Sequence, residues 1–131
     1  MLNHWISLSL GGLLLAGCRP PIPIQVTGAD MGRHIDLRMH QEMELRLEAN
    51  PTTGYRWQVI RAAPAVLDVL AGERHAPAPS APGVVGGGGT MTWRFRAARA
   101  GQDSLELVYR RPWEPESASA QTFKCEVAVR P

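Results

Sequence analysis

Apolar and charged residues alternate one by one along most of this chain, and this period of two constrains the possible folds strongly. In the segment 42–48, for example, Met43, Leu45 and Leu47 are separated by charged residues. Successive side chains of a β-strand point to opposite faces, so such a segment predicts a strand with one buried and one solvated face. The same pattern, least regular over 66–70, predicts strands at 24–26, 35–39, 42–48, 55–59, 66–70, 91–96, 105–110 and 123–129.

These short segments indicate an all-β protein, because no long stretch of helical periodicity competes with them. The 13 Gly and 11 Pro residues supply the turns that many short strands need. Seven or eight strands, each with one apolar face, bury those faces best as two packed sheets. We therefore expect a single antiparallel β-sandwich with Greek-key connections over residues 24–131.

The charges exclude several classes of function. The chain carries 14 Lys+Arg against 12 Asp+Glu, and its net charge of +2 is spread along its length. There is no basic block of the kind that follows a phosphate backbone, so we expect no nucleic-acid binding. The histidines, at positions 4, 34, 40 and 75, have no matching nucleophile and acid, so we expect no catalytic residues and no enzyme activity.

The segment 31–43 combines methionine and histidine side chains, which are ligands that could suit copper. Alternation argues against it, because Met39 and Met43 fall on the apolar face and His34 and His40 on the opposite face. Core methionines and solvated histidines explain the pattern better. We therefore expect no metal and no cofactor.

The N-terminal segment has the features of a targeting signal. Residues from Trp5 to Gly17 are apolar or small and uncharged, too few to span a membrane as a helix. They lead into Leu15-Ala16-Gly17-Cys18, which resembles the lipobox of bacterial lipoproteins. The resemblance implies a signal peptide at 1–17, a lipidated Cys18 and a short tether at 18–23. Since the first five residues lack Lys and Arg, a plain secretory signal cleaved nearby is the alternative.

In either case the protein is expected to be exported. A lipid on Cys18 would anchor it to the bacterial cell envelope, at a periplasmic or outer-membrane face, without any spanning segment. Cys125 then has no intramolecular partner. Since Cys125 alternates with Phe123 and Val127, we expect a buried thiol that acts as a small hydrophobic residue.

Three loops of unusual composition connect the predicted strands, at 49–54, 72–89 and 111–120. In a Greek-key sandwich alternate connections emerge at the same end, so we expect these three loops to share one end. The first contains Asn50-Pro51-Thr52-Thr53-Gly54, whose residue types favour a stiff loop, although an ordinary turn has the same composition.

The other two loops are suited to contacts with a partner. The glycines from Gly86 to Gly89 allow a close backbone approach and strand-like pairing with a groove, although 76–85 reads equally as a loose linker. In Arg110-Arg111-Pro112-Trp113 an indole lies beside charged groups. Trp and Arg are frequent binding hot spots, and a Trp folded back onto its own sandwich is the alternative.

Together, the motif Asn-Pro-Thr-Thr-Gly-Tyr-x-Trp, a glycine run before an aromatic strand, and Arg-Pro-Trp resemble the chagasin-type inhibitors of papain-family cysteine peptidases. The resemblance covers roughly residues 24–129 and implies a monomeric, immunoglobulin-like sandwich that inhibits reversibly. It also implies that Thr52 and Thr53 lie nearest the catalytic cysteine and histidine of the enzyme, with the other two loops on either side. The implied peptidase-binding residues are Asn50, Pro51, Thr52, Thr53, Gly54, Tyr55, Gly86, Gly87, Gly88, Gly89, Arg111, Pro112 and Trp113.

A protein of a different class remains open at this point. An immunoglobulin-like adhesion or assembly module on a lipoprotein would have the same strands and would bind protein or glycan without inhibiting anything. An assay with a papain-type peptidase separates the two interpretations.

Overall fold

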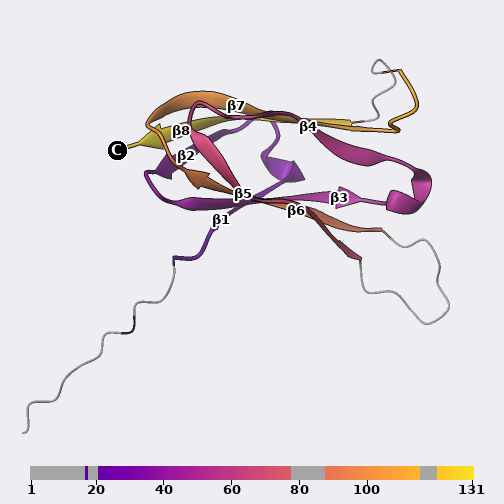
Figure 1. The fold of residues 1–131 in the computed structure, drawn as a ribbon, viewed down its shortest axis with the longest axis horizontal. Coiled ribbons are helices and arrows are strands. Elements are labelled where there is room, and N and C mark those ends of the chain that lie inside the picture. The colour runs from indigo at the N-terminus through magenta and orange to yellow at the C-terminus, as the bar shows by residue number, and fades with distance from the viewer. Residues whose placement is uncertain (1–16, 18–20, 78–87, 116–120) are drawn as a thin grey trace, which may run out of the picture.

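The computed structural model describes residues 17, 21–77, 88–115 and 121–131, which form two four-stranded sheets packed face to face (Figure 1). One sheet has the strand order β1-β3-β6-β5, and the other has the order β2-β8-β7-β4. The strands are β1 (Ile24–Thr27), β2 (His34–Arg38), β3 (Glu42–Ala49), β4 (Arg56–Ala62), β5 (Leu67–Pro77), β6 (Gly89–Ala97), β7 (Gly101–Arg110) and β8 (Gln121–Arg130). The predicted all-β sandwich is confirmed.

Two short 3₁₀ turns, η1 (Gly28–Asp30) and η2 (Pro51–Thr53), are the helical elements of the described residues. Within those ranges, no helix has the length and apolar character that crossing a membrane requires. The predicted signal peptide, apart from Gly17, and the predicted lipidation site Cys18 lie outside the described residues.

The sheets are mixed, which differs from the predicted purely antiparallel arrangement. Among the described strands, four pairings are antiparallel, but β1 pairs with β3 and β2 pairs with β8 in parallel. The alternation of apolar and polar residues is the same whichever way a strand runs, so the sequence pattern carried no information about these directions. The two parallel strands are the short N-terminal ones, each at the edge of its sheet.

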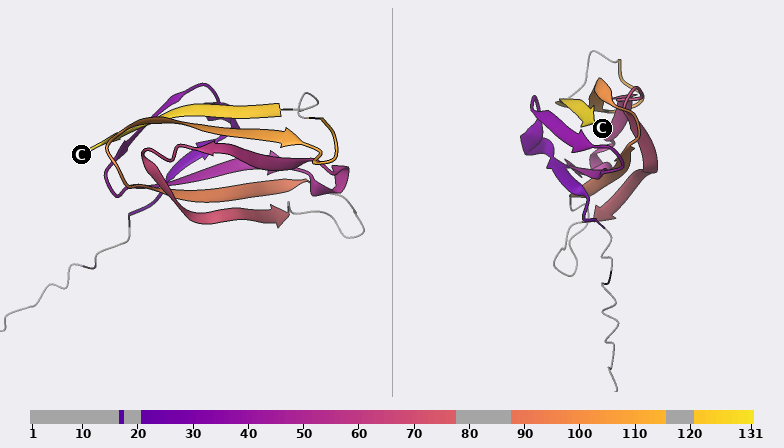
Figure 2. Two further views of the ribbon diagram at one scale, coloured as in Figure 1. Left: turned by 45° about the horizontal axis from the view of Figure 1, so that its top comes forward. Right: turned by 90° about the vertical axis from the view of Figure 1, so that its left-hand side faces the viewer.

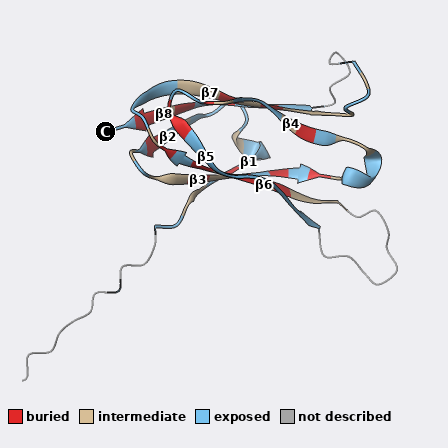
Figure 3. Cartoon of the chain, in the orientation of Figure 1, coloured by how far each residue is buried: buried red, intermediate tan, exposed pale blue. Residues whose placement is uncertain are grey.

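The core lies between the two sheets and is built from alternate residues of the strands (Figure 3). Met43, Leu45 and Leu47 of β3 are buried as predicted, and their charged neighbours lie on the outer face. No buried residue of the described chain is polar or charged. The largest fully buried side chains are those of Phe95, Phe123, Leu37, Met43, Leu45, Leu105 and Leu107.

The strand β5 differs from the prediction in its length and in its pattern. It continues to Pro77, through residues 72–77 that were expected to belong to a loop. Its pairing with β6 shifts register after Val69 and again after Ala71, so strict alternation fails, and Val69 is 55% exposed. Irregularities of this kind are common at sheet edges, and β5 is an edge strand.

A hydrogen bond joins the two sheets at the end of the sandwich where β3 finishes. The buried indole of Trp57, on β4, donates a hydrogen bond from Nε1 to the Glu48 carbonyl oxygen at 2.9 Å. The two residues belong to opposite sheets, so the bond fixes the spacing between the sheets here. The views in Figure 2 show that η2 and the described ends of β5, β6 and β7 lie at this end, while the C-terminus lies at the other.

We predict that Cys125 reacts slowly with thiol reagents as long as the protein is folded. Cys125 is a free thiol, 1% exposed, and burial together with the nearby Glu126 and Asp30 charges raises its pKa to about 11. At pH 8 only about one thiol in a thousand is then ionised, against a substantial fraction in the unfolded chain. Alkylation by iodoacetamide, followed at Cys125 by peptide mass spectrometry, should be on the order of 100-fold faster in denaturant. Rapid alkylation in the native protein would contradict the burial.

Candidate functional site

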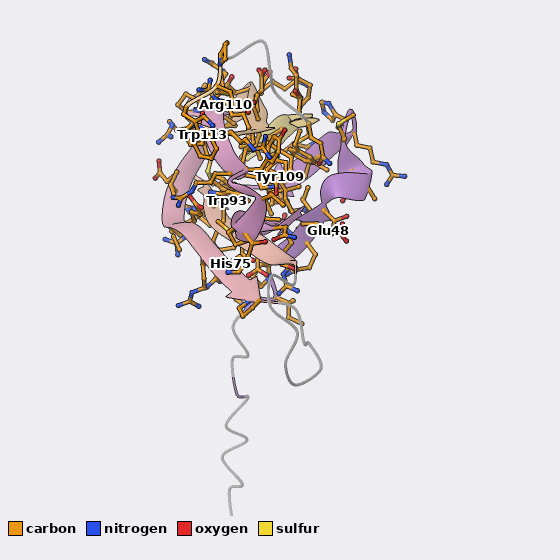
Figure 4. The ribbon with its side chains drawn as sticks, turned by 90° about the vertical axis from the view of Figure 1, so that its right-hand side faces the viewer. Glu48, His75, Trp93, Tyr109, Arg110 and Trp113 are labelled. Atoms are coloured by element: carbon orange, nitrogen blue, oxygen red, sulfur yellow. The ribbon has the colours of Figure 1, made fainter. Side chains whose placement is uncertain are left out.

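Three segments meet at one end of the sandwich, which we call the loop end: residues 50–55, the described edge of the β5–β6 hairpin, and residues 111–115. The β3–β6 pairing sets Ala49, which leads into the first segment, directly opposite Gly89 at the start of β6. The third segment follows β7, which pairs with β4 from Arg56 onwards. The prediction that these segments share one end is confirmed for the described residues, and Gly86 and Gly87 lie outside them. Figure 4 looks onto this end.

The first segment is closed by hydrogen bonds of its own residues. Asn50 precedes η2, and its Oδ1 accepts bonds from the backbone N–H of Thr52 at 3.2 Å and from the Thr52 hydroxyl at 2.5 Å. The Thr53 hydroxyl donates to the Asn50 carbonyl oxygen at 2.7 Å, and the N–H of Gly54 donates to the Pro51 carbonyl oxygen at 3.1 Å. The loop is therefore stiff, as its composition predicted, and Pro51, Thr52 and Thr53 remain exposed.

Gly54 joins the first segment to the third. Its φ of 81° lies in the left-handed region that glycine adopts at little cost. A Cβ built on Gly54 would collide with the Cη2 atom of Trp113, so the indole lies directly against this α-carbon. Trp113 is nevertheless 71% exposed, because only one edge of its ring makes this contact. The ring thus touches the neighbouring loop and presents most of its surface to solvent, and its role in binding stays a prediction.

Arg111 points back onto the first segment. Its Nε donates to the Thr53 carbonyl oxygen at 3.1 Å, and its guanidinium carbon lies 4.5 Å from the centre of the Tyr55 ring. A further bond of 3.2 Å reaches the Glu114 carboxylate. These contacts connect the segment 111–115 to the segment 50–55, so that the two are held together as one unit.

Aromatic rings form the base of the loop end. The Tyr109 ring lies between those of Tyr55 and Trp57, with centroid distances of 5.2 Å and 5.0 Å. The Tyr109 hydroxyl accepts a hydrogen bond from the backbone N–H of Asn50 at 3.0 Å. The alternation of polarity predicts Tyr109 only as a strand residue and gives it no role at the loop end. The sequence feature that could have indicated its role is its position, because Tyr109 is an aromatic residue with a hydroxyl group at the end of a strand, just before the Arg-Arg-Pro-Trp motif.

The hairpin glycines allow close backbone packing. A Cβ on Gly89 would collide with the Ala76 carbonyl oxygen and would lie 2.6 Å from His75 Nε2. Gly88 lies near the Ala49 carbonyl oxygen, at 3.7 Å from the position of a Cβ. Between this hairpin and the first segment is a hollow of about 450 Å³, lined by Glu48, Ala49, Asn50, Gly88, Gly89, Thr90, Tyr109 and Gln121.

The chemistry of the loop end is that of a binding surface. The hydroxyls of Thr52 and Thr53 both donate hydrogen bonds within the loop, and no general base lies beside them among the described residues. No group of His, Cys, Asp and Glu side chains in the described chain has the arrangement of a metal site. A rigid, exposed loop flanked by an exposed indole is suited to filling a groove in another protein.

The class defined by this fold and site is that of a loop-presenting, immunoglobulin-like binding protein. The family model described as "Chagasin family peptidase inhibitor I42" matches residues 36–127, and the chain belongs to this family. It is 33% identical over 98 residues to Amoebiasin-1 of Entamoeba histolytica, covering 73% of this chain and 89% of that protein. It is 28% identical over 102 residues to Chagasin of Trypanosoma cruzi, covering 76% and 91%.

A solved structure supports the fold. The crystal structure of the cysteine protease inhibitor EhICP2 from Entamoeba histolytica superposes with a TM-score of 0.73 at 20% identity, covering 82% of this chain and 95% of that one. Membership of a family of peptidase inhibitors agrees with the expectation that the protein is not an enzyme. It does not favour the non-inhibitory adhesion or assembly module.

We predict that Gly54→Ala destabilises the protein and disturbs Trp113. The left-handed backbone costs an Ala residue about 1–2 kcal/mol, and the new methyl group displaces the indole. Urea unfolding measures the loss, and the matched control is Gly72→Ala, where a Cβ meets nothing within 4 Å. The control should change the free energy of unfolding by less than about 0.5 kcal/mol. Equal stability of the two variants would contradict the contact.

Proposed function

We propose that this protein is a reversible, tight-binding inhibitor of papain-family cysteine peptidases, and that its loop end blocks the active-site cleft. The observation that carries the proposal is the rigidity of the segment 50–54, which is held by its own hydrogen bonds and by Arg111 and Trp113. Membership of the chagasin family supports it. We also propose that the inhibitor acts as a monomer.

The first segment is the part that we place in the cleft. Pro51, Thr52 and Thr53 form its exposed tip, and Thr52 and Thr53 would lie nearest the catalytic cysteine and histidine. Because the loop is ordered before binding, little conformational entropy is lost when the complex forms. No covalent step is needed, since the loop only has to exclude substrate and water from the thiolate.

The two flanking segments would dock on either side of the catalytic residues. The glycine run 86–89 would lie along the substrate groove, where residues without side chains permit backbone pairing with the enzyme. Arg111, Pro112 and Trp113 would contact the opposite side, where the exposed indole offers a large apolar area to bury. Affinity should therefore depend on loop shape more than on charge.

We predict that Thr52→Lys raises the inhibition constant for papain by at least about 30-fold, because a long charged side chain does not fit a closed contact in the cleft. The thermal transition should change little, since Thr52 lies outside the core. The control is Ala100→Lys, which adds the same charge at an exposed turn at the opposite end of the sandwich. Undiminished inhibition by Thr52→Lys, or no inhibition by the unmodified protein in excess, would refute the proposed site.

We also propose that Cys18 carries a lipid and that the protein is anchored to the envelope of a bacterium, at a periplasmic or outer-membrane face. The support is the lipobox-like run that ends at Cys18 and the apolar, uncharged residues before it. The folded domain begins only six residues later, at Ile24, so the tether is short. An acyl anchor of this kind needs no membrane-spanning segment.

The lipid anchor predicts a clear change in fractionation. The full-length protein expressed in a bacterium should separate with membranes and incorporate labelled palmitate, whereas Cys18→Ala should do neither. Cys125→Ala is the control, because it removes the other cysteine, which is buried in the core. Membrane association that persists unchanged in Cys18→Ala would rule out the anchor.

A further inference from the structure

The loop proposed to enter the cleft is held at its beginning by a residue of β7 and at its end by the residue that directly follows β7. Tyr109 is the next-to-last residue of β7, and Arg111 is the first residue after it. Tyr109 contacts the beginning of the loop and Arg111 contacts its end. Only Arg111 belongs to the motifs singled out in the sequence.

At the beginning of the loop, Tyr109 holds Asn50 through a hydrogen bond. The hydroxyl oxygen of Tyr109 lies 3.0 Å from the backbone nitrogen of Asn50 and accepts its hydrogen. Asn50 is the residue whose side chain organises Thr52, so the bond fixes the starting point of the whole turn. Tyr109 and Asn50 are 59 residues apart in the sequence, and the bond connects β7 in one sheet to the end of β3 in the other.

The contact of Arg111 at the end of the loop is supported by a row of four neighbouring groups, in which the two tyrosine rings are stacked and the Trp57 ring is tilted against Tyr109. In order these are the Arg111 guanidinium and the rings of Tyr55, Tyr109 and Trp57, with distances of 4.5 Å, 5.2 Å and 5.0 Å between successive members. The Tyr55 ring lies against the Arg111 guanidinium, whose Nε donates to the Thr53 carbonyl oxygen. Tyr109 is a member of both arrangements, since its hydroxyl binds Asn50 and its ring supports Tyr55.

We propose that Tyr109 is a positioning residue for peptidase inhibition, and that Tyr109 and Arg111 together form a clamp that holds the segment 50–54 in its binding conformation. This inference rests on the proposed function. Arg111 acts through the loop as well as by any contact of its own with the enzyme, because its guanidinium group is engaged by Thr53, Tyr55 and Glu114. Tyr109 is partly buried beneath the loop and need not touch the enzyme.

The clamp makes a quantitative prediction for Tyr109→Phe. This variant keeps the ring and its place in the row of four groups but removes the acceptor for the Asn50 N–H. The fraction of molecules with a correctly placed loop then falls, and the apparent dissociation constant rises by the inverse of that fraction. A single hydrogen bond of ordinary strength sets the upper limit of this rise at about fivefold to tenfold, which is reached when the loop without the bond is mostly displaced.

The matched control is Ser104→Ala, which lies on the same strand at the opposite end of the sandwich. It also loses one hydroxyl hydrogen bond, from Ser104 to the Glu126 carboxylate at 2.8 Å. Both variants are compared with the unmodified protein by inhibition of papain, by thermal unfolding, and by amide hydrogen exchange of residues 50–54. Only Tyr109→Phe should weaken inhibition and accelerate exchange in this segment.

The exchange measurement needs no peptidase, so it tests the clamp separately from the proposed function. If the unmodified protein fails to inhibit papain, the proposed function fails, and exchange still shows whether Tyr109 holds the loop. Unchanged exchange in Tyr109→Phe overturns the clamp, whether or not inhibition changes. Equal weakening of inhibition by Ser104→Ala and Tyr109→Phe also overturns it, because a general loss of stability would then explain both.

Discussion

Burial of the two apolar sheet faces against each other is the constraint on which the rest of the structure depends. Side chains such as Phe95 and Phe123 are almost fully withdrawn from water and fix how the sheets lie on one another. The packing of the sheets sets the positions at which β3 and β7 finish and β6 begins, and therefore which segments meet at the loop end. The loops need no disulfide to meet, because the strands beneath them are already aligned.

Within the loop end, two groups of residues have different tasks. Pro51, Thr52 and Trp113 are exposed and offer surface to a partner. Asn50, Arg111 and Tyr109 are partly buried, and their polar groups bind other parts of the same loops. The Asn-Pro-Thr-Thr and Arg-Pro-Trp motifs each contain residues of both kinds, so only some residues of a motif are placed to contact an enzyme. The exposed residues are held rigidly because the partly buried residues beneath them form hydrogen bonds to the same loops.

Much of the fold could be predicted from the sequence, because burial on one face leaves a period of two. Met43, Leu45 and Leu47 followed this rule. The direction of β1 and β2 and the continuation of β5 beyond residue 72 could not be predicted, since neither parallel pairing nor an irregular edge strand has its own pattern of polarity. At the candidate site the loops were recognised from local motifs, whereas the contact of Tyr109 with Asn50 depends on packing between distant segments.

The parallel pairing of β1 with β3 determines at which end of the sandwich the N-terminal segment enters the domain. Ile24 lies level with Met43, near the start of β3, and β3 runs towards the loop end. The chain thus enters the sandwich about 20 Å short of the loops, a distance set by six residues of extended strand. An anchor on Cys18 would therefore hold the domain by the end away from the loops, which leaves the loop end free to point into the surrounding solution.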